Sequence, residues 1–184
     1  MQQKHIRNSW YFYVCFFFVF SVIGWLCETA WVLTDWQRFV NRGFLYGPYL
    51  PIYGVGSTLT IICFEKTYNK KTYLGKINIK PFLIFVYSFI ILSVLEYVSS
   101  YLLEMIFDMR WWSYDNNKLN LNGRICLKNS IYFGVSGVLI MYSVYTFAIK
   151  LTNHISEKFL KIFAWSVSTV MVIDIIISVM RYSG

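Results

Sequence analysis

Long apolar segments separated by short polar ones dominate the pattern of this chain. A helix that crosses about 30 Å of hydrocarbon needs about 20 mostly apolar residues. Five segments qualify or come near: Trp10 to Leu33, Tyr49 to Phe64, Pro81 to Phe107, Asn129 to Ile149 and Leu160 to Met180. Because these segments are apolar all round rather than on one face, they read as membrane spans. The pattern predicts an all-α fold, a polytopic transmembrane helical bundle of five spans that forms one integral membrane domain over residues 1–184.

The second segment gives the weakest prediction of the five. It is short and contains Pro51, Gly54 and Gly56, which disfavour a regular helix. Irregular backbone at membrane depth is tolerated where it is buried in protein or lines a wet cavity. A tilted, broken or partly re-entrant helix is therefore the alternative to a continuous second span.

Composition supports a membrane protein and excludes an ordinary soluble domain. The chain is 57% hydrophobic and only 14% charged, whereas a soluble domain is roughly 25% charged. The first segment is too long for a secretory signal, and no A-x-A-like cleavage site follows it. The net charge of +8 comes largely from lysines between the spans, so we expect no nucleic-acid partner.

The loop charges predict the orientation of the chain. With the N-terminus inside, ten of the 17 Lys and Arg residues are cytoplasmic and seven are outside. This bias predicts a multi-pass protein of the bacterial cell membrane with a cytoplasmic N-terminus and an external C-terminus. Nine of the ten inner charges are lysine and five of the seven outer ones are arginine. Arginine is the residue suited to gripping a carboxylate or phosphate with fixed geometry.

Four carboxylates lie within the predicted spans: Glu28, Glu96, Glu104 and Asp174. An ionisable group in hydrocarbon is costly and usually marks a site or a paired contact. We expect Asp174 to pair with Arg181 and Glu104 to lie at the interface. We expect Glu28 and Glu96 to share a polar cavity that loop arginines close. Glu96, Ser100 and Glu104 recur at intervals of four, so they line one face of a helix.

Two polar stretches, Asn41 to Pro48 and Arg110 to Leu127, form structured outer loops. The first has glycines and prolines that force turns, and it either presents backbone N–H groups to an anionic ligand or is a packed connection. The second combines a tryptophan pair with several asparagines, which either bind a sugar or phosphate headgroup or build Asx turns. The candidate ligand-binding residues are Glu28, Asn41, Arg42, Tyr46, Tyr53, Glu96, Ser100, Arg110, Trp111, Tyr114, Asn122 and Arg124.

The remaining motifs give no sign of metal or cofactor chemistry. The four cysteines include no C-x-x-C pair, and the two histidines stand alone, so we expect no metal and no cofactor. A nucleophile elbow, a Walker phosphate loop and a dinucleotide fingerprint are all missing from the sequence. Any ATP-driven activity therefore needs a separate ATPase subunit, and no catalytic residue is assigned.

Several stretches of the chain resemble the bacterial family described as Putative ABC-transporter type IV, also called CmpB-type or ABC transporter permease. The resemblance rests on Gly24 to Glu28 (GWLCE), Asn41 to Gly54 (NRGFLYGPYLPIYG), Glu96 to Glu104 (EYVSSYLLE), Arg110 to Tyr114 (RWWSY) and Leu121 to Leu127 (LNGRICL). Ser113 departs from the aspartate expected in the tryptophan motif, and Asp115 follows two residues later. The resemblance implies a role in transport.

Three classes of function fit these observations. The leading one is a permease-like or accessory transport subunit with an outward-facing site for an anionic or zwitterionic ligand, either a lipid or a small molecule. The second is a membrane-embedded enzyme that acts on a lipid or lipid-linked substrate, with Glu28 or Glu96 as acid or base and Arg42, Arg110 and Arg124 holding phosphate. The third is a structural or regulatory membrane subunit. The oligomeric state is not readable from the sequence.

Overall fold

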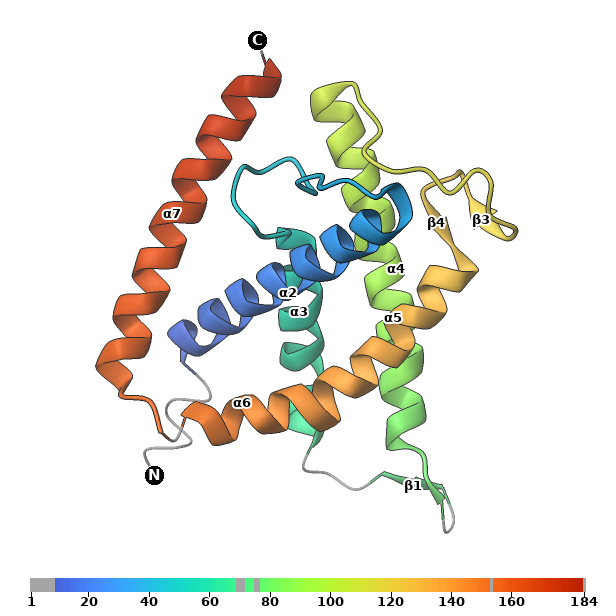
Figure 1. The fold of residues 1–184 in the computed structure, drawn as a ribbon. Helices are drawn as coiled ribbons and strands as arrows, with labels where there is room; N and C mark the ends of the chain where they lie inside the picture. The colour runs from blue at the N-terminus through green and yellow to red at the C-terminus, as the bar shows by residue number, and fades with distance from the viewer. Residues whose placement is uncertain (1–8, 69–71, 75–76, 153, 184) are drawn as a thin grey trace. The chain divides into compact units, whose positions relative to one another are not determined.

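The computed structural model describes residues 9–68, 72–74, 77–152 and 154–183, and most of them are helical (Figure 1). The inner-loop lysines Lys70, Lys71 and Lys76 lie outside these residues. In chain order the elements are α2 (Trp10–Trp36), α3 (Pro51–Tyr68), β1 (Tyr73–Leu74), β2 (Ile77–Asn78), α4 (Lys80–Phe107), β3 (Asn120–Leu121), β4 (Ile125–Cys126), α5 (Leu127–Leu139), η1 (Ile140–Val144), α6 (Tyr145–Thr152) and α7 (Glu157–Ser183).

The chain divides into two compact units. The first unit comprises Met1–Thr58 and Ala148–Gly184, and the second comprises Leu59–Phe147. The first therefore contains α2, the first outer loop, the start of α3, the end of α6 and all of α7. The second contains the end of α3, both short hairpins, α4, α5, η1 and the start of α6.

The prediction of a membrane-spanning helical protein is confirmed in its main feature. Within the described residues, four helices are long and apolar enough to cross a membrane: Trp10–Trp36, Lys80–Phe107, Leu127–Leu151 and Glu157–Tyr182. Helix α3 is not among them, so the count of five spans stays a prediction. It is nevertheless one continuous helix of 18 residues, without the break offered as an alternative.

Helix α3 begins and ends later in the chain than the predicted segment Tyr49 to Phe64. Pro51 is the first residue of the helix, where a missing N–H costs nothing and the fixed φ favours helix formation. The helix also continues past Phe64 to Tyr68. Glu65, which follows the end of the predicted segment, is a helical residue and is buried.

In the first unit, α2 and α7 pack with their N-terminal ends together. Tyr11 lies in a buried cluster with Leu160 and Ala164, and the rings of Trp10 and Trp165 lie 5.4 Å apart. Beyond this contact, the loop that follows α2 folds back against α7. Its residues Leu45 and Tyr49 form a second buried cluster with Met171. The two helices thus run in the same direction, with the outer loop packed against both of them.

In the second unit, α4 and α5 form an antiparallel pair. The Ser93 hydroxyl donates to the Ser130 hydroxyl over 2.7 Å, and nearer the start of α4 and the end of α5, Gly137 lies against Ser88. Helix α5 continues through the π-helical turn η1 into α6. The β3–β4 hairpin lies at the opposite end of α4 from β1 (Figure 1). The second outer loop is therefore concentrated where α4 ends and α5 begins.

Candidate functional site

Polar side chains of the second outer loop meet one face of α4. Glu96, Ser100 and Glu104 are spaced by four residues, and each of them contacts this loop or the start of α5. The loop can reach them because α4 continues about 16 Å beyond Glu96, at 1.5 Å per residue, and the chain then turns back along the helix. We call this group the Glu96–Arg124 cluster; it consists of Glu96, Ser100, Glu104, Arg110, Tyr114, Asp115, Arg124 and Asn129.

Arg124 is the central cation of the cluster, and only 9% of it is exposed. One end of its guanidinium donates to Ser100 Oγ over 3.1 Å, and the other forms an ion pair with Glu104. The guanidinium also lies over the ring of Tyr101, 5.4 Å from its centroid. The β3–β4 hairpin places Arg124 in this position, because Asn122 and Gly123 adopt the positive φ that its tight turn requires. Burial with three partners fixes the guanidinium in one orientation.

Glu96 is buried within α4 and bonds to the second outer loop. Its Oε1 accepts a hydrogen bond of 2.8 Å from the Tyr114 hydroxyl, which in turn accepts one of 2.6 Å from Asn129 Nδ2. The carboxylate therefore faces protein groups, as a membrane-embedded acid should. Tyr114 is itself held by a backbone bond of 2.7 Å from its N–H to the carbonyl of Gly123.

Glu104 is shared by two arginines, so its predicted role as a residue that merely lies at the interface is incomplete. Arg110 lies 3.6 Å from Glu104 and 3.7 Å from Asp115, which makes the group an alternating series of charges. Asp115 also accepts a hydrogen bond of 2.5 Å from the Ser113 hydroxyl. The carboxylate of Asp115 is therefore next to the position at which the family motif is expected to carry an aspartate.

The other two candidates in this loop have supporting positions. Asn122 donates to the Tyr97 hydroxyl over 2.9 Å, on the stripe of α4 beside the cluster. Trp111 packs edge-on against Phe107, with 6.1 Å between the ring centroids. Both contacts fasten the loop to the last turns of α4.

The candidates of the first loop gather in the first unit around Glu28. Glu28 Oε1 accepts from the Tyr53 hydroxyl over 2.7 Å, and Oε2 accepts from Arg42 Nε over 3.3 Å. Asn41 bridges α2 and its own loop, because its Oδ1 accepts from Trp25 Nε1 over 2.6 Å and its amide donates to the Tyr46 carbonyl over 3.1 Å. The Glu28–Arg42 ion pair has a single N–O contact, and each of its side chains is 33% exposed, so it is weaker than the contacts of Arg124.

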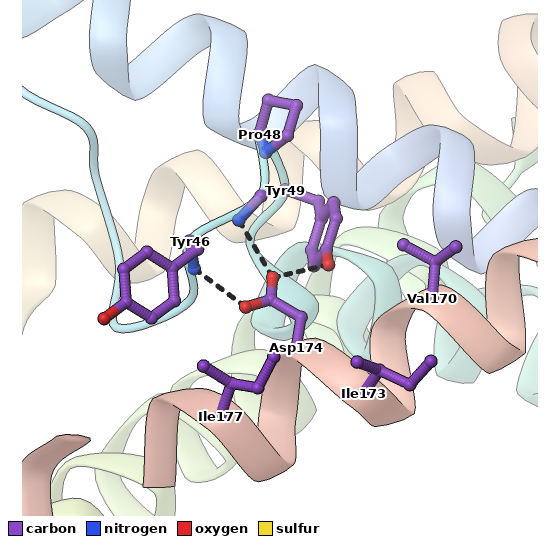
Figure 2. Close-up of a pocket in the computed structure, with 8 residues that line it drawn as sticks. Tyr46, Pro48, Tyr49, Val170, Ile173, Asp174 and Ile177 are labelled. Carbon is purple, nitrogen blue, oxygen red and sulfur yellow. Dashed lines mark hydrogen bonds between the residues drawn. The ribbon is translucent and has the colours of Figure 1, made fainter. Parts of the chain in front are cut away.

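Asp174 has a different partner from the one predicted. Its carboxylate accepts hydrogen bonds from the backbone N–H groups of Tyr46 and Gly47, over 3.0 and 2.8 Å, and from the Tyr49 hydroxyl over 2.5 Å (Figure 2). Among the described residues it makes no ion pair with Arg181, whose guanidinium lies over the Tyr46 ring instead. The expected pair is therefore wrong, because the carboxylate faces the loop rather than the next turns of α7. The loop does present successive N–H groups to an anion, but this anion belongs to the protein.

Tyr49 is held as a protonated donor to this carboxylate. Burial raises the pKa of its hydroxyl well above the usual range, and the hydrogen bond and charge of Asp174 raise it further. The hydroxyl therefore keeps its proton at every physiological pH. The first outer loop is locked to α7 by three donors at once.

Sequence reasoning thus found most of the polar residues, but it grouped them differently. Glu28 and Glu96 belong to different units, each with its own partners, so their shared cavity stays a prediction. Sequence reasoning missed Gly47, Tyr49 and Asn129 as partners and assigned Asp174 a different role. The dense glycine and proline pattern of the first loop was the available signal for a carboxylate held by backbone groups. Within the described residues, no group of three or more His, Cys, Asp and Glu residues is placed to hold a metal ion.

Comparison with known proteins identifies the family. Residues 15–179 match the family model described as Putative ABC-transporter type IV. The chain belongs to this family. No curated protein and no solved structure gives a match. The membership confirms the resemblance read from the sequence, and together with the apolar helices it makes this family member a transport-related membrane protein.

Proposed function

We propose that this type IV family member is a permease-like or accessory membrane subunit that works with a separate ATPase, and that the Glu96–Arg124 cluster binds an anionic or zwitterionic ligand at the outer face. The observation that supports the site is the burial of two charged residues at α4, an apolar helix long enough to span a membrane: Glu96 is buried within the helix, and Arg124 is buried against it. Buried charge is costly in such a helix and is usually functional.

The ion pairs of the cluster favour a zwitterionic ligand over a purely anionic one. Arg110 and Arg124 are already neutralised by Glu104, and Arg110 also by Asp115. An added anion alone would compete with Glu104 and Asp115 for these arginines and would lie beside their like charges, which disfavours its binding. A zwitterion would break one ion pair within the cluster and form two new ones. Its anionic group would pair with an arginine, and its cationic group would pair with the carboxylate that this arginine released.

The proposed outward-facing site requires both outer loops to lie on the same side of the membrane. In the first unit, α2 and α7 start at the same end, so they cross in the same direction. The chain must therefore cross an odd number of times between them. The antiparallel pair formed by α4 and the helix Leu127–Leu151 supplies two crossings, which leaves one for α3. Its 18 residues span about 27 Å at 1.5 Å per residue, enough for a short crossing.

Labelling from intact cells tests this topology. In a background without cysteine, Phe39→Cys, Leu74→Cys and Leu119→Cys place thiols at positions that are 65, 72 and 74% exposed. With five spans, a membrane-impermeant maleimide should label the first and third and spare the second. Labelling of position 39 without position 119 would show that α3 does not cross. The native Cys126 is not a suitable probe, since only 2% of it is exposed.

Purification from native membranes in mild detergent, followed by reconstitution, tests the function. We expect an ATPase subunit to co-purify and ATP-dependent transport of the co-purifying small molecule to appear in proteoliposomes. Arg124→Lys should reduce this transport at least about tenfold, because a lysine ammonium cannot contact Ser100 and Glu104 at the same time as the two ends of the planar guanidinium do. The matched control is Arg38→Lys, at an exposed arginine that lies over Trp36.

The other outcomes separate the remaining classes of function. Turnover of a lipid-linked substrate without ATP would replace the proposal with the membrane enzyme. Full activity of Arg124→Lys, with both variants folded, would remove the cluster from the site. An assembly that contains no ATPase and tolerates both substitutions would indicate a structural or regulatory subunit.

A further inference from the structure

A groove in the first unit lies between the first outer loop and α7, and no residue of the Glu96–Arg124 cluster lines it. It encloses about 530 Å³. The lining residues are Tyr46, Gly47, Pro48, Tyr49, Val170, Ile173, Asp174 and Ile177. Figure 2 shows the three aliphatic side chains of α7 beside the two tyrosines of the loop. Val170, Ile173 and Ile177 are each about half exposed, so the groove has an apolar wall open to its surroundings.

The polar groups in the groove are already engaged with one another. Asp174 accepts hydrogen bonds from two backbone N–H groups and from the hydroxyls of Tyr49 and Ser178. These contacts saturate the carboxylate, so the wall presents apolar surface rather than a polar docking point. An apolar occupant therefore fits the groove.

The cationic side chain of Arg181 lies at one end of the groove. Arg181 lies one turn beyond Ile177 on α7, about 6 Å further along the helix at 1.5 Å per residue. Its guanidinium lies 5.1 Å from the ring centroid of Tyr46, which also lines the groove. Arg42, Arg110 and Arg124 are paired with carboxylates, whereas within the described part of the chain Arg181 contacts only the rings of Tyr46 and Tyr182. A guanidinium that stacks on a ring keeps its N–H edge available for phosphate oxygens.

We propose that this groove is a binding site for an anionic phospholipid, with an acyl chain against Val170, Ile173 and Ile177 and the headgroup phosphate at Arg181. The apolar wall belongs to a helix suited to crossing the membrane, so acyl chains are its natural surroundings. The arginine lies in the last turn of that helix, where headgroups are expected. This site is independent of the proposed transport role and stands if that role fails.

Native mass spectrometry of the detergent-solubilised protein, titrated with phosphatidylglycerol, tests the site. Arg181→Gln should weaken binding about tenfold, the loss expected for one charge-assisted contact to phosphate. Ile173→Trp should also weaken it severalfold by filling the groove. Diacylglycerol with the same acyl chains should bind the unmodified protein about tenfold more weakly, and this comparison requires no variant.

Two matched controls separate the site from generic lipid contact. Arg38→Gln removes an exposed arginine that also stacks on an aromatic ring, but neither Arg38 nor that ring, Trp36, lines this groove. Ile176→Trp adds the same bulk at an exposed position of α7 that does not line the groove. Both variants should bind phosphatidylglycerol within about twofold of the unmodified protein. Thermal unfolding in the same detergent checks that all four variants are folded.

Three results would overturn the proposal. Equal losses for Arg181→Gln and Arg38→Gln would reduce Arg181 to a generic interfacial charge. Loss with Arg181→Gln but not with Ile173→Trp, together with competition by free glycerol phosphate, would leave a phosphate site without a lipid. A co-purifying protein segment that occupies the groove and excludes phosphatidylglycerol would assign it to a protein partner.

Discussion

Replacing Asp174 with asparagine should destabilise the first unit by about 2–4 kcal/mol, although only one atom changes. The aspartate accepts two backbone N–H bonds and two hydroxyl bonds. An asparagine has one acceptor oxygen, and its NH₂ group would face donors of the loop. At least one of the N–H groups of Tyr46 and Gly47 would then lose its acceptor. The first outer loop should detach from α7.

Thermal unfolding in detergent, followed by tryptophan fluorescence, measures this effect. A loss of this size should lower the midpoint by roughly 5–15 °C for a chain of this length. Trypsin provides a second readout, because release of the loop should speed cleavage after Arg38 and Arg42. Asp35→Asn makes the same change at an exposed position of α2 and should leave both readouts unchanged. An Asp174→Asn protein as stable and as resistant as the unmodified one would show that the carboxylate does not anchor the loop.

The case of Asp174 shows what sequence pattern could and could not provide. The sequence indicated that Asp174 lies in an apolar segment, where an unpartnered carboxylate is energetically costly. Its partner was not indicated, because Arg181 is near in sequence whereas Tyr46 and Gly47 are over 120 residues away. The relevant donors are also backbone groups, which leave no residue-type signal. Only the turn-forming residues around Tyr46 indicated that this loop had unusual backbone geometry.

The face of α4 was predictable, because it depends on local helix geometry alone. Glu96, Ser100 and Glu104 lie at intervals of four, and the structure brings each of them to the loop or its arginines. The pairing of Arg124 with Glu104 rather than with Glu28 or Glu96 depends on the β3–β4 hairpin. Hairpin register sets which side chain points to α4, and a single-residue slip would reverse it. The sequence therefore allowed the helix face to be predicted, but not the register of the hairpin.

Helix α3 is the element for which sequence reasoning was most divided, and its glycines explain why. Pro51 and Gly54 suggested a break, yet the helix is continuous. Gly54 is instead a packing residue: a Cβ at this position would lie 2.6 Å from the backbone oxygen of Phe17 and 2.3 Å from Ser21 Oγ on α2. Small residues let two membrane helices approach closely. Gly54 therefore does not break α3 but allows α3 to pack closely against α2.

Substituting Gly54 with valine should therefore force α2 and α3 apart and destabilise the protein by about 3 kcal/mol or more. The closest obstacle on α2 includes a main-chain oxygen, which cannot rotate away, so removing the hydroxyl with Ser21→Ala should not rescue the variant. The displacement should also break the 2.7 Å bond between Tyr53, the neighbour of Gly54, and Glu28.

Thermal unfolding and size-exclusion chromatography in detergent measure the effect of Gly54→Val. The control is Cys63→Val, which places the same β-branched side chain at an exposed position of the same helix. Its effect on stability should be no more than a few tenths of a kcal/mol, because cysteine and valine have similar helix propensities. A Gly54→Val protein that unfolds at the same temperature as Cys63→Val would mean that α2 and α3 do not pack at this distance. The approach of the two helices would then have to be rejected, along with the placement of Tyr53 against Glu28.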